Sequence, residues 1–98
     1  MKPTEQHNCV PHKVYIEGEM TIYRAAEMKQ TLLTPITERA RVEFDLSKVT
    51  SLDSSGVQLL MLAMKTAQVM HTELRLVAKS AVVVDVMDVL NLGLYFND

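Results

Sequence analysis

The chain has 98 residues, of which 48% are hydrophobic and 22% are charged, a composition typical of a globular domain and not of a disordered segment. This length allows one domain with a real core, because two domains would each fall below the usual size. The formal net charge of −2 and the absence of a Lys or Arg cluster exclude the electrostatic pattern of nucleic-acid binders, so we expect protein or small-molecule partners.

The N-terminal segment contains the chain's single cysteine, Cys9. A lone cysteine cannot form an internal disulfide, which favours a cytoplasmic location. No apolar run approaches signal-peptide or membrane-span length, so we expect no membrane insertion. The spacing of His7, Cys9 and His12 matches no common zinc site. We therefore expect neither a metal nor a cofactor.

The chain opens with a polar segment that leads into a first clear strand. Residues 1–12 contain two prolines and no sustained alternation, which predicts a flexible lead or a weak edge strand. Residues 13–17 alternate between apolar and polar side chains, so we expect a strand that ends in a turn at Gly18.

A first helix is expected to follow, with Thr21 as its N-cap. The apolar residues that would share one face of it are Ala25, Met28, Leu32 and Ile36. Pro35 removes a backbone donor, so this helix should kink or stop near residue 33 or 34.

Residues 42–70 change from a strand pattern to a helix pattern. Val42, Phe44 and Leu46 alternate with acidic residues, as in a strand with one buried face. From about residue 55 to residue 70 the apolar side chains recur at helical spacing instead. Between the two patterns lie four small residues, Asp53, Ser54, Ser55 and Gly56. Their oxygens can accept hydrogen bonds from the first turn of the helix, so a hydroxyl is presented at a strand-to-helix corner.

The next alternating segment, residues 74–78, predicts another strand. Strand, helix and strand then form a βαβ unit, which sets the two strands parallel. The corner at Asp53 and Ser54 therefore lies at the carboxyl edge of the sheet, where open α/β sheets carry their working residues.

The last segment, residues 80–92, is rich in valine but has its two aspartates at helical spacing. We predict a helix with Ser80 as N-cap, ended by Gly93, and a short final edge strand over residues 94–96.

The corner and its flanking elements resemble the bacterial anti-sigma factor antagonists, which are single STAS domains. The matching stretches are Asp53-Ser54-Ser55-Gly56, Gly18-Glu19-Met20 and Ser80-Ala81-Val82, within roughly residues 13–96. The resemblance implies an α/β STAS fold: a mixed sheet of four to five strands with helices packed mainly on one face. Residues 1–98 would then be a single STAS domain.

In that family the Ser directly after the Asp accepts phosphate from a partner kinase that is also the anti-sigma factor, and this position corresponds to Ser54. The resemblance thus implies a phosphoprotein that binds the kinase when Ser54 is unmodified, releases it when Ser54 is phosphorylated, and is reset by a Ser/Thr phosphatase. The expected partner-binding residues are Glu19, Thr21, Asp53, Ser54, Ser55 and Gly56. The best-known antagonists carry an Asp where this chain has Thr21, which leaves the identity of the kinase open.

Other interpretations remain at this stage. On the residues alone, Ser54 and Ser55 are also explained as helix caps. The chain would then be a constitutive adaptor subunit of a lipid-transport or chemosensory complex. Binding of a small molecule at the same edge is a third interpretation. The sequence also leaves open whether the chain forms a homodimer. We expect no catalysis, because His71 lies at the far end of a helix about 25 Å long and the other histidines lie in the N-terminal lead.

Overall fold

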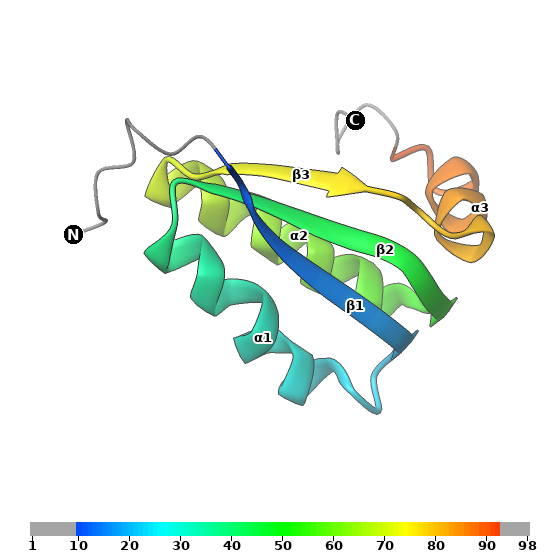
Figure 1. The fold of residues 1–98 in the computed structure, drawn as a ribbon. Helices are drawn as coiled ribbons and strands as arrows, with labels where there is room; N and C mark the ends of the chain where they lie inside the picture. The colour runs from blue at the N-terminus through cyan, green and yellow to red at the C-terminus, as the bar shows by residue number, and fades with distance from the viewer. Residues whose placement is uncertain (1–9, 93–98) are drawn as a thin grey trace.

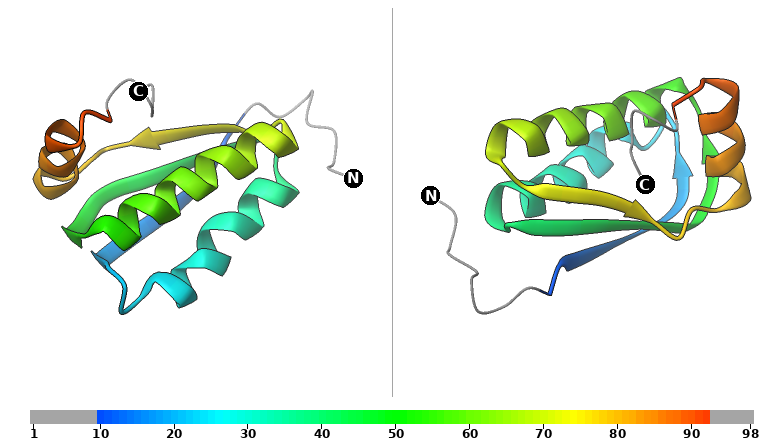
Figure 2. Two further views of the ribbon diagram at one scale, coloured as in Figure 1. Left: turned by 180° about the vertical axis from the view of Figure 1, so that it is seen from behind. Right: turned by 90° about the horizontal axis from the view of Figure 1, so that it is seen from above.

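The computed structural model describes residues 10–92, which form three strands and three helices (Figure 1). In chain order these are β1 (His12–Met20), α1 (Ala25–Glu38), β2 (Arg41–Leu52), α2 (Ser54–Met70), β3 (Glu73–Val77) and α3 (Ala81–Val89). The strands pair in the order β1-β2-β3, and both pairs are parallel. α1 and α2 lie side by side on one face of the sheet, whereas α3 lies beyond its carboxyl edge (Figure 2).

The sheet of the described residues differs from the predicted mixed sheet of four to five strands. It has three strands, all parallel, because each connection is a crossover through a helix and not a hairpin. The expected additional strands fall on residues 1–12 and 94–96, which lie outside the described range except for residues 10–12, and His12 already belongs to β1. The prediction of an α/β fold with its crossover helices on one face is confirmed.

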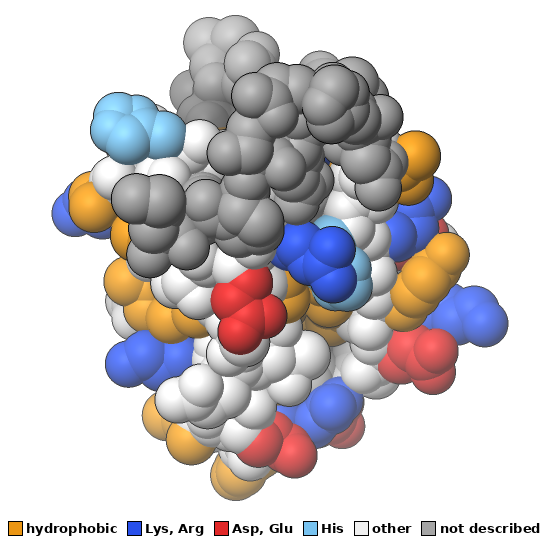
Figure 3. Space-filling model, turned by 60° about the vertical axis from the view of Figure 1, so that its left-hand side comes forward, with side chains coloured by type: hydrophobic (Ala, Val, Ile, Leu, Met, Phe, Trp, Pro, Cys, Tyr) orange, Lys and Arg blue, Asp and Glu red, His pale blue; other side chains and the backbone are white. Residues whose placement is uncertain are grey.

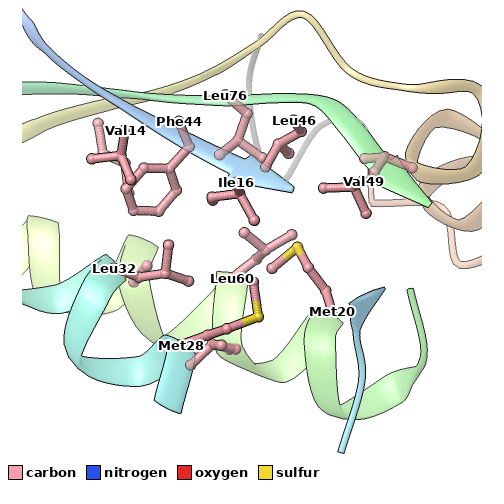
Figure 4. Packing of buried hydrophobic residues seen from close by; sticks show 14 of the residues in the cluster. Val14, Ile16, Met20, Met28, Leu32, Phe44, Leu46, Val49, Leu60 and Leu76 are labelled. Carbon is pink, nitrogen blue, oxygen red and sulfur yellow. The ribbon is translucent and has the colours of Figure 1, made fainter. Parts of the chain in front are cut away.

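The core lies between the sheet and the two crossover helices (Figure 4). Val42, Phe44 and Leu46 are buried as their alternation predicts, and Phe44 is 0% exposed. Leu32 of α1 and Leu60 of α2 meet them from the helical side. The opposite face of the sheet is polar and carries cross-strand ion pairs, Lys13 with Glu43 and Arg41 with Glu73.

α1 departs from its prediction at both ends. It begins at Ala25, and its N-cap position is Arg24, which makes no side-chain cap hydrogen bond. Thr21 is buried four residues earlier, and its backbone carbonyl accepts from the N–H of Arg24 in a turn. Pro35 lies inside the helix, which continues to Glu38. The burial of Ile36 after the proline stabilises this last turn despite the missing donor.

Gly18 lies within β1 and not in a turn after it. Its φ of 84° is in the left-handed region, and the pairing register with β2 shifts between Gly18 and Glu19. This bulge lets β1 bend with β2 and carry the chain to Met20 at the carboxyl edge.

The last helix begins as predicted, since the Ser80 hydroxyl accepts from the backbone N–H of Val83. α3 ends earlier than expected, at Val89, and the left-handed residue after it is Asn91, with φ 58°. The predicted terminator Gly93 lies outside the described residues. β3 ends at Val77, because Ala78 takes a left-handed φ of 51°. No helix within residues 10–92 has the length and hydropathy needed to cross a bilayer.

Candidate functional site

The predicted corner is built around the carboxylate of Asp53. β2 ends at Leu52 and α2 begins at Ser54, so Asp53 alone connects them and takes the N-cap position. Its Oδ1 accepts from the backbone N–H of Gly56 at 3.0 Å. Its Oδ2 accepts from the backbone N–H of Ile22, 31 residues earlier, at 3.1 Å. One side chain therefore fixes both the start of α2 and the loop between β1 and α1.

These two hydrogen bonds also set the charge state of the corner. Hydrogen bonds from the N–H of Gly56 and then from that of Ile22 hold the pKa of Asp53 below its ordinary value. Asp53 is therefore ionised at neutral pH, and its negative charge lies at the positive end of the helix dipole of α2.

Gly56 is buried where α2 crosses the end of β1. A Cβ at this position would collide with the carbonyl oxygen of Met20 and would lie 2.6 Å from Cδ1 of Leu52. In addition, the N–H of Asp53 donates to that same Met20 carbonyl at 3.3 Å. The geometry gives Gly56 a packing role beneath the surface, and its predicted part in partner binding stays a prediction.

Ser54 is the first residue of α2 and is exposed. Its hydroxyl has no hydrogen-bond partner within residues 10–92. Ser55 beside it is half-buried. Because Asp53 makes the cap, the interpretation of Ser54 as the helix cap is wrong.

The end of β1 brings the other predicted residues to the same edge. Glu19 is exposed and its Oε1 accepts from the Thr21 hydroxyl at 3.5 Å, while Thr21 itself is only 8% exposed. The guanidinium of Arg24 donates to the carbonyls of Glu17 and Glu19, at 2.9 and 3.2 Å. Of the predicted set, Glu19, Ser54 and in part Asp53 and Ser55 are accessible to a partner, whereas Thr21 lies mainly below the surface.

Apolar side chains also surround the corner, and none of them was among the predicted partner-binding residues. Ile22 and Tyr23 are 66% and 89% exposed in the loop whose N–H Asp53 holds, and Val89 at the end of α3 is 83% exposed. The sequence did carry a signal for Ile22 and Tyr23. They follow Thr21 and precede the apolar stripe of α1, and neither belongs to that stripe.

A groove of about 330 Å³ separates the start of α2 from α3. Apolar side chains form most of its wall: Leu52, Val57, Val86, Val89 and Leu90. Asp53, Ser54 and Asp85 complete it, so the exposed hydroxyl lies at the rim of an apolar surface.

Charges of both signs lie close together on one face of the molecule. On the face that Figure 3 shows, Lys and Arg side chains are interspersed with Asp and Glu. Within residues 10–92, no three His, Cys, Asp or Glu side chains are placed to share a metal ion. His7 and Cys9 of the motif considered above lie outside those residues.

Comparisons with known proteins agree with this architecture. A family model described as "Mlab, STAS domain" matches residues 4–94. Among solved structures, "Structure of the Anti-Sigma Factor Antagonist SpoIIAA in its Unphosphorylated Form" is similar with a TM-score of 0.69 and 20% identity, over 89% of this chain and 79% of that one. That likeness shows the fold alone, and no curated protein matches. Because the family match spans nearly the whole sequence, this chain belongs to the STAS domain family.

Proposed function

We propose that this chain is a phospho-regulated switch protein like the anti-sigma factor antagonists. It binds a protein kinase that is also an anti-sigma factor while Ser54 is unmodified, and releases it when Ser54 is phosphorylated. The observation that carries the proposal is the free, exposed hydroxyl of Ser54 on a helix that Asp53 already caps. A hydroxyl that makes no structural hydrogen bond can accept a phosphate without loss of the fold.

The start of α2 can tolerate that phosphate. A phosphoserine adds about −1.5 to −2 charge, and the free N–H groups and dipole of a helix N-terminus favour anions. The main effect should fall on the partner, because an interface formed around a neutral hydroxyl would have to accommodate a dianion. Phosphorylation would therefore release the complex and leave the domain folded.

The proposed contact surface surrounds the hydroxyl. Glu19 and the Asp53–Ser55 segment supply polar contacts, and the exposed side chains of Ile22 and Tyr23 supply apolar area. Exposed aromatic residues beside polar groups are common anchors of protein interfaces. The fold shared with the anti-sigma factor antagonist SpoIIAA supports this assignment.

We further propose that the chain acts by binding and not by catalysis. His71 is the C-cap of α2, about 25 Å from Ser54 along the helix. His12 begins β1, at the opposite end of a nine-residue strand from the corner. Among residues 10–92, neither histidine is placed to serve as a base for Ser54. In the proposed cycle the partner kinase adds the phosphate and a phosphatase removes it. The proposed setting is the cytoplasm, with no nucleic-acid contact and no membrane insertion.

A second candidate is a constitutive adaptor subunit of a larger complex, such as one for lipid transport or chemosensing. One observation favours it: the matching family model carries the description Mlab and does not name the antagonists. In an adaptor, the corner would contact its partner permanently and Ser54 would stay unmodified.

The test compares native protein with Ser54→Ala and Ser54→Asp. Each form is used as bait, and the recovered partner is then titrated against all three while mass spectrometry follows Ser54 in cells. The switch predicts native-like affinity for Ser54→Ala, a loss of about 30-fold or more for Ser54→Asp, and phosphate on native Ser54. Lys48→Glu, which adds negative charge at an exposed site of β2 outside the corner and the grooves, is the control. Equal affinity for all forms, with Ser54 unmodified, would leave the adaptor.

A further inference from the structure

The outer face of α2 is unusual for a helix that faces solvent. Its exposed residues lie in a stripe along one side of the helix: Ser54, Gln58, Leu62, Lys65, Gln68 and Val69. Lys65 is the single charged residue among the 17 of α2, and Val69 is 75% exposed. A solvated helix face normally carries many charges, so this composition is typical of a face that another protein covers.

A groove of about 450 Å³ runs beside this stripe, between α1 and α2. Its main lining residues are Ala25, Ala26, Lys29, Gln58, Leu59 and Leu62, and Ser55 lies at one end. Gln58 and Leu62 also belong to a second hollow that reaches Lys65, so the two form one continuous surface. The helices lie side by side there (Figure 2), and the small side chains of Ala25 and Ala26 line the α1 side of the groove.

The charges at this groove have one sign. Lys29 lines it from α1 and Lys65 from α2, and no acidic side chain among the described residues lines either hollow. Neither lysine has an ion-pair partner within residues 10–92. The surface is thus locally positive in a chain whose formal net charge is −2.

We infer that the groove between α1 and α2 binds an acidic amphipathic helix of the partner protein. Its apolar residues would cover Leu62 and Val69, and its carboxylates would reach Lys29 and Lys65. A second copy of this chain fits less well, because meeting through the same face would place lysine against lysine with no acid between them.

This inference rests on the proposed function and deepens it. Ser55 lines the groove directly after Ser54, so a phosphate on Ser54 would lie at the end of the surface that the acidic helix occupies. Like charges repel, so phosphorylation would weaken this partner, whereas it would attract a basic one. The acidic character of the helix thus accounts for the direction of the switch.

The experiment is photo-crosslinking of the full chain in its own cells. p-Benzoylphenylalanine replaces Gln58 in the groove or, in a second variant, Val69 at the far end of the stripe. Tyr15, which is 66% exposed on the opposite face of the sheet, is the control position. Each variant is also made with the double reversal Lys29→Glu and Lys65→Glu, and with Lys48→Glu as a matched reversal at an exposed site outside the groove.

We expect an adduct from position 58 or 69 and not from position 15, with an Asp- and Glu-rich peptide at the crosslink. The double reversal should lower its yield about tenfold, and Lys48→Glu should not. No adduct, an adduct with a second copy of the chain, a basic crosslinked peptide, or a yield indifferent to Lys29 and Lys65 would overturn the inference. Ser54→Asp in the same assay separates the two proposals: an adduct sensitive to the lysines but not to Ser54→Asp would retain the acidic helix and remove the switch.

Discussion

α1 and α2 both start at the carboxyl edge of the sheet, but they start in opposite ways. α2 follows β2 after a single residue, Asp53, which caps it, and Gly56 seats its first turn against Met20. α1 follows β1 only after a four-residue linker, has no side-chain cap, and is preceded by the exposed Ile22 and Tyr23. The α2 start is thus fixed by its own cap and close packing, whereas the α1 start depends on hydrogen bonds that Ile22 and Arg24 make to other segments.

The start of α2 and the loop before α1 therefore present different features at the same edge of the sheet. The capped start of α2 fixes the backbone at Ser54, and in the proposed switch this is the segment that presents the hydroxyl to the kinase. The loop before α1 exposes the apolar side chains of Ile22 and Tyr23. The hydrogen bond from the Ile22 N–H to Asp53 is the direct link between the two.

Gly56→Ala should cause the largest loss and would test how tightly the α2 start is seated. The new Cβ would collide with a backbone carbonyl, which cannot move aside, so we expect a loss of about 3 kcal/mol or more in the free energy of unfolding. Gly18→Ala is the matched comparison: its φ of 84° adds strain, but the close atom is Nη1 of Arg24, a side-chain tip that can move aside by giving up its bonds to Glu17 and Glu19. It should therefore cost less, about 1 to 2 kcal/mol. Denaturant unfolding of both variants measures the ranking, and equal losses would contradict it.

Asp53→Ala should follow, because it removes the cap of α2 and the link to Ile22 together. Asp53→Asn keeps an acceptor for one of the two N–H groups, so its melting temperature should lie between those of Asp53→Ala and the native protein. Hydrogen exchange at the Ile22 amide should rise in both variants. An unchanged exchange rate would show that the two helix starts are not coupled through this side chain.

The acid stability of the protein should depend on the same carboxylate. The pKa of Asp53 is lower in the folded state than in the unfolded chain, so its contribution is complete above the unfolded value, about 3.9, and is lost as the pH falls through the folded value. The stability gap between native protein and Asp53→Asn should therefore close below about pH 4. Asp45, whose pKa is lowered first by its side-chain hydrogen bond with Ser47, is the control. Asp45→Asn should show a similar pH dependence without weakening partner binding.

Arg24→Ala should have a smaller effect, confined to the α1 start. It removes the donor to the carbonyls of Glu17 and Glu19, which should cost about 1 kcal/mol. Amide exchange should rise over residues 21–28 while the first turn of α2 keeps its protection. A simultaneous rise in exchange at both helix starts would mean that the start of α1 supports the start of α2.

Ser54→Ala should change stability least, by no more than about 0.5 kcal/mol, because the hydroxyl makes no bond within the described residues and Asp53 is the cap. Calorimetric melting beside Asp53→Ala measures the contrast. A loss near 1 kcal/mol, the usual effect of removing a cap, would return Ser54 to a structural role.

Much of the fold was readable from local pattern. The alternation of Val42, Phe44 and Leu46 predicted the buried face of the central strand, and Ser80 was correctly placed as a cap, because periodicity and capping depend on neighbouring residues. The predictions at Thr21 and Pro35 were wrong because burial in the tertiary structure outweighed the local preference of each residue. Thr21 is a good cap in isolation but is buried, and the helix continues past Pro35 because burial of Ile36 outweighs the lost backbone bond.

For the site, the sequence by itself determined that Asp53, Ser54, Ser55 and Gly56 stand where a strand gives way to a helix, because both patterns are local. Only the tertiary structure decided the long-range contacts of these residues. Oδ2 of Asp53 meets the N–H of Ile22 across 31 residues, and Gly56 faces the carbonyl of Met20. Contacts at such separation leave no periodic trace in the sequence. The link from Asp53 to Ile22 and the packing of Gly56 against Met20 therefore follow only from the parallel pairing that brings the ends of β1 and β2 to one edge.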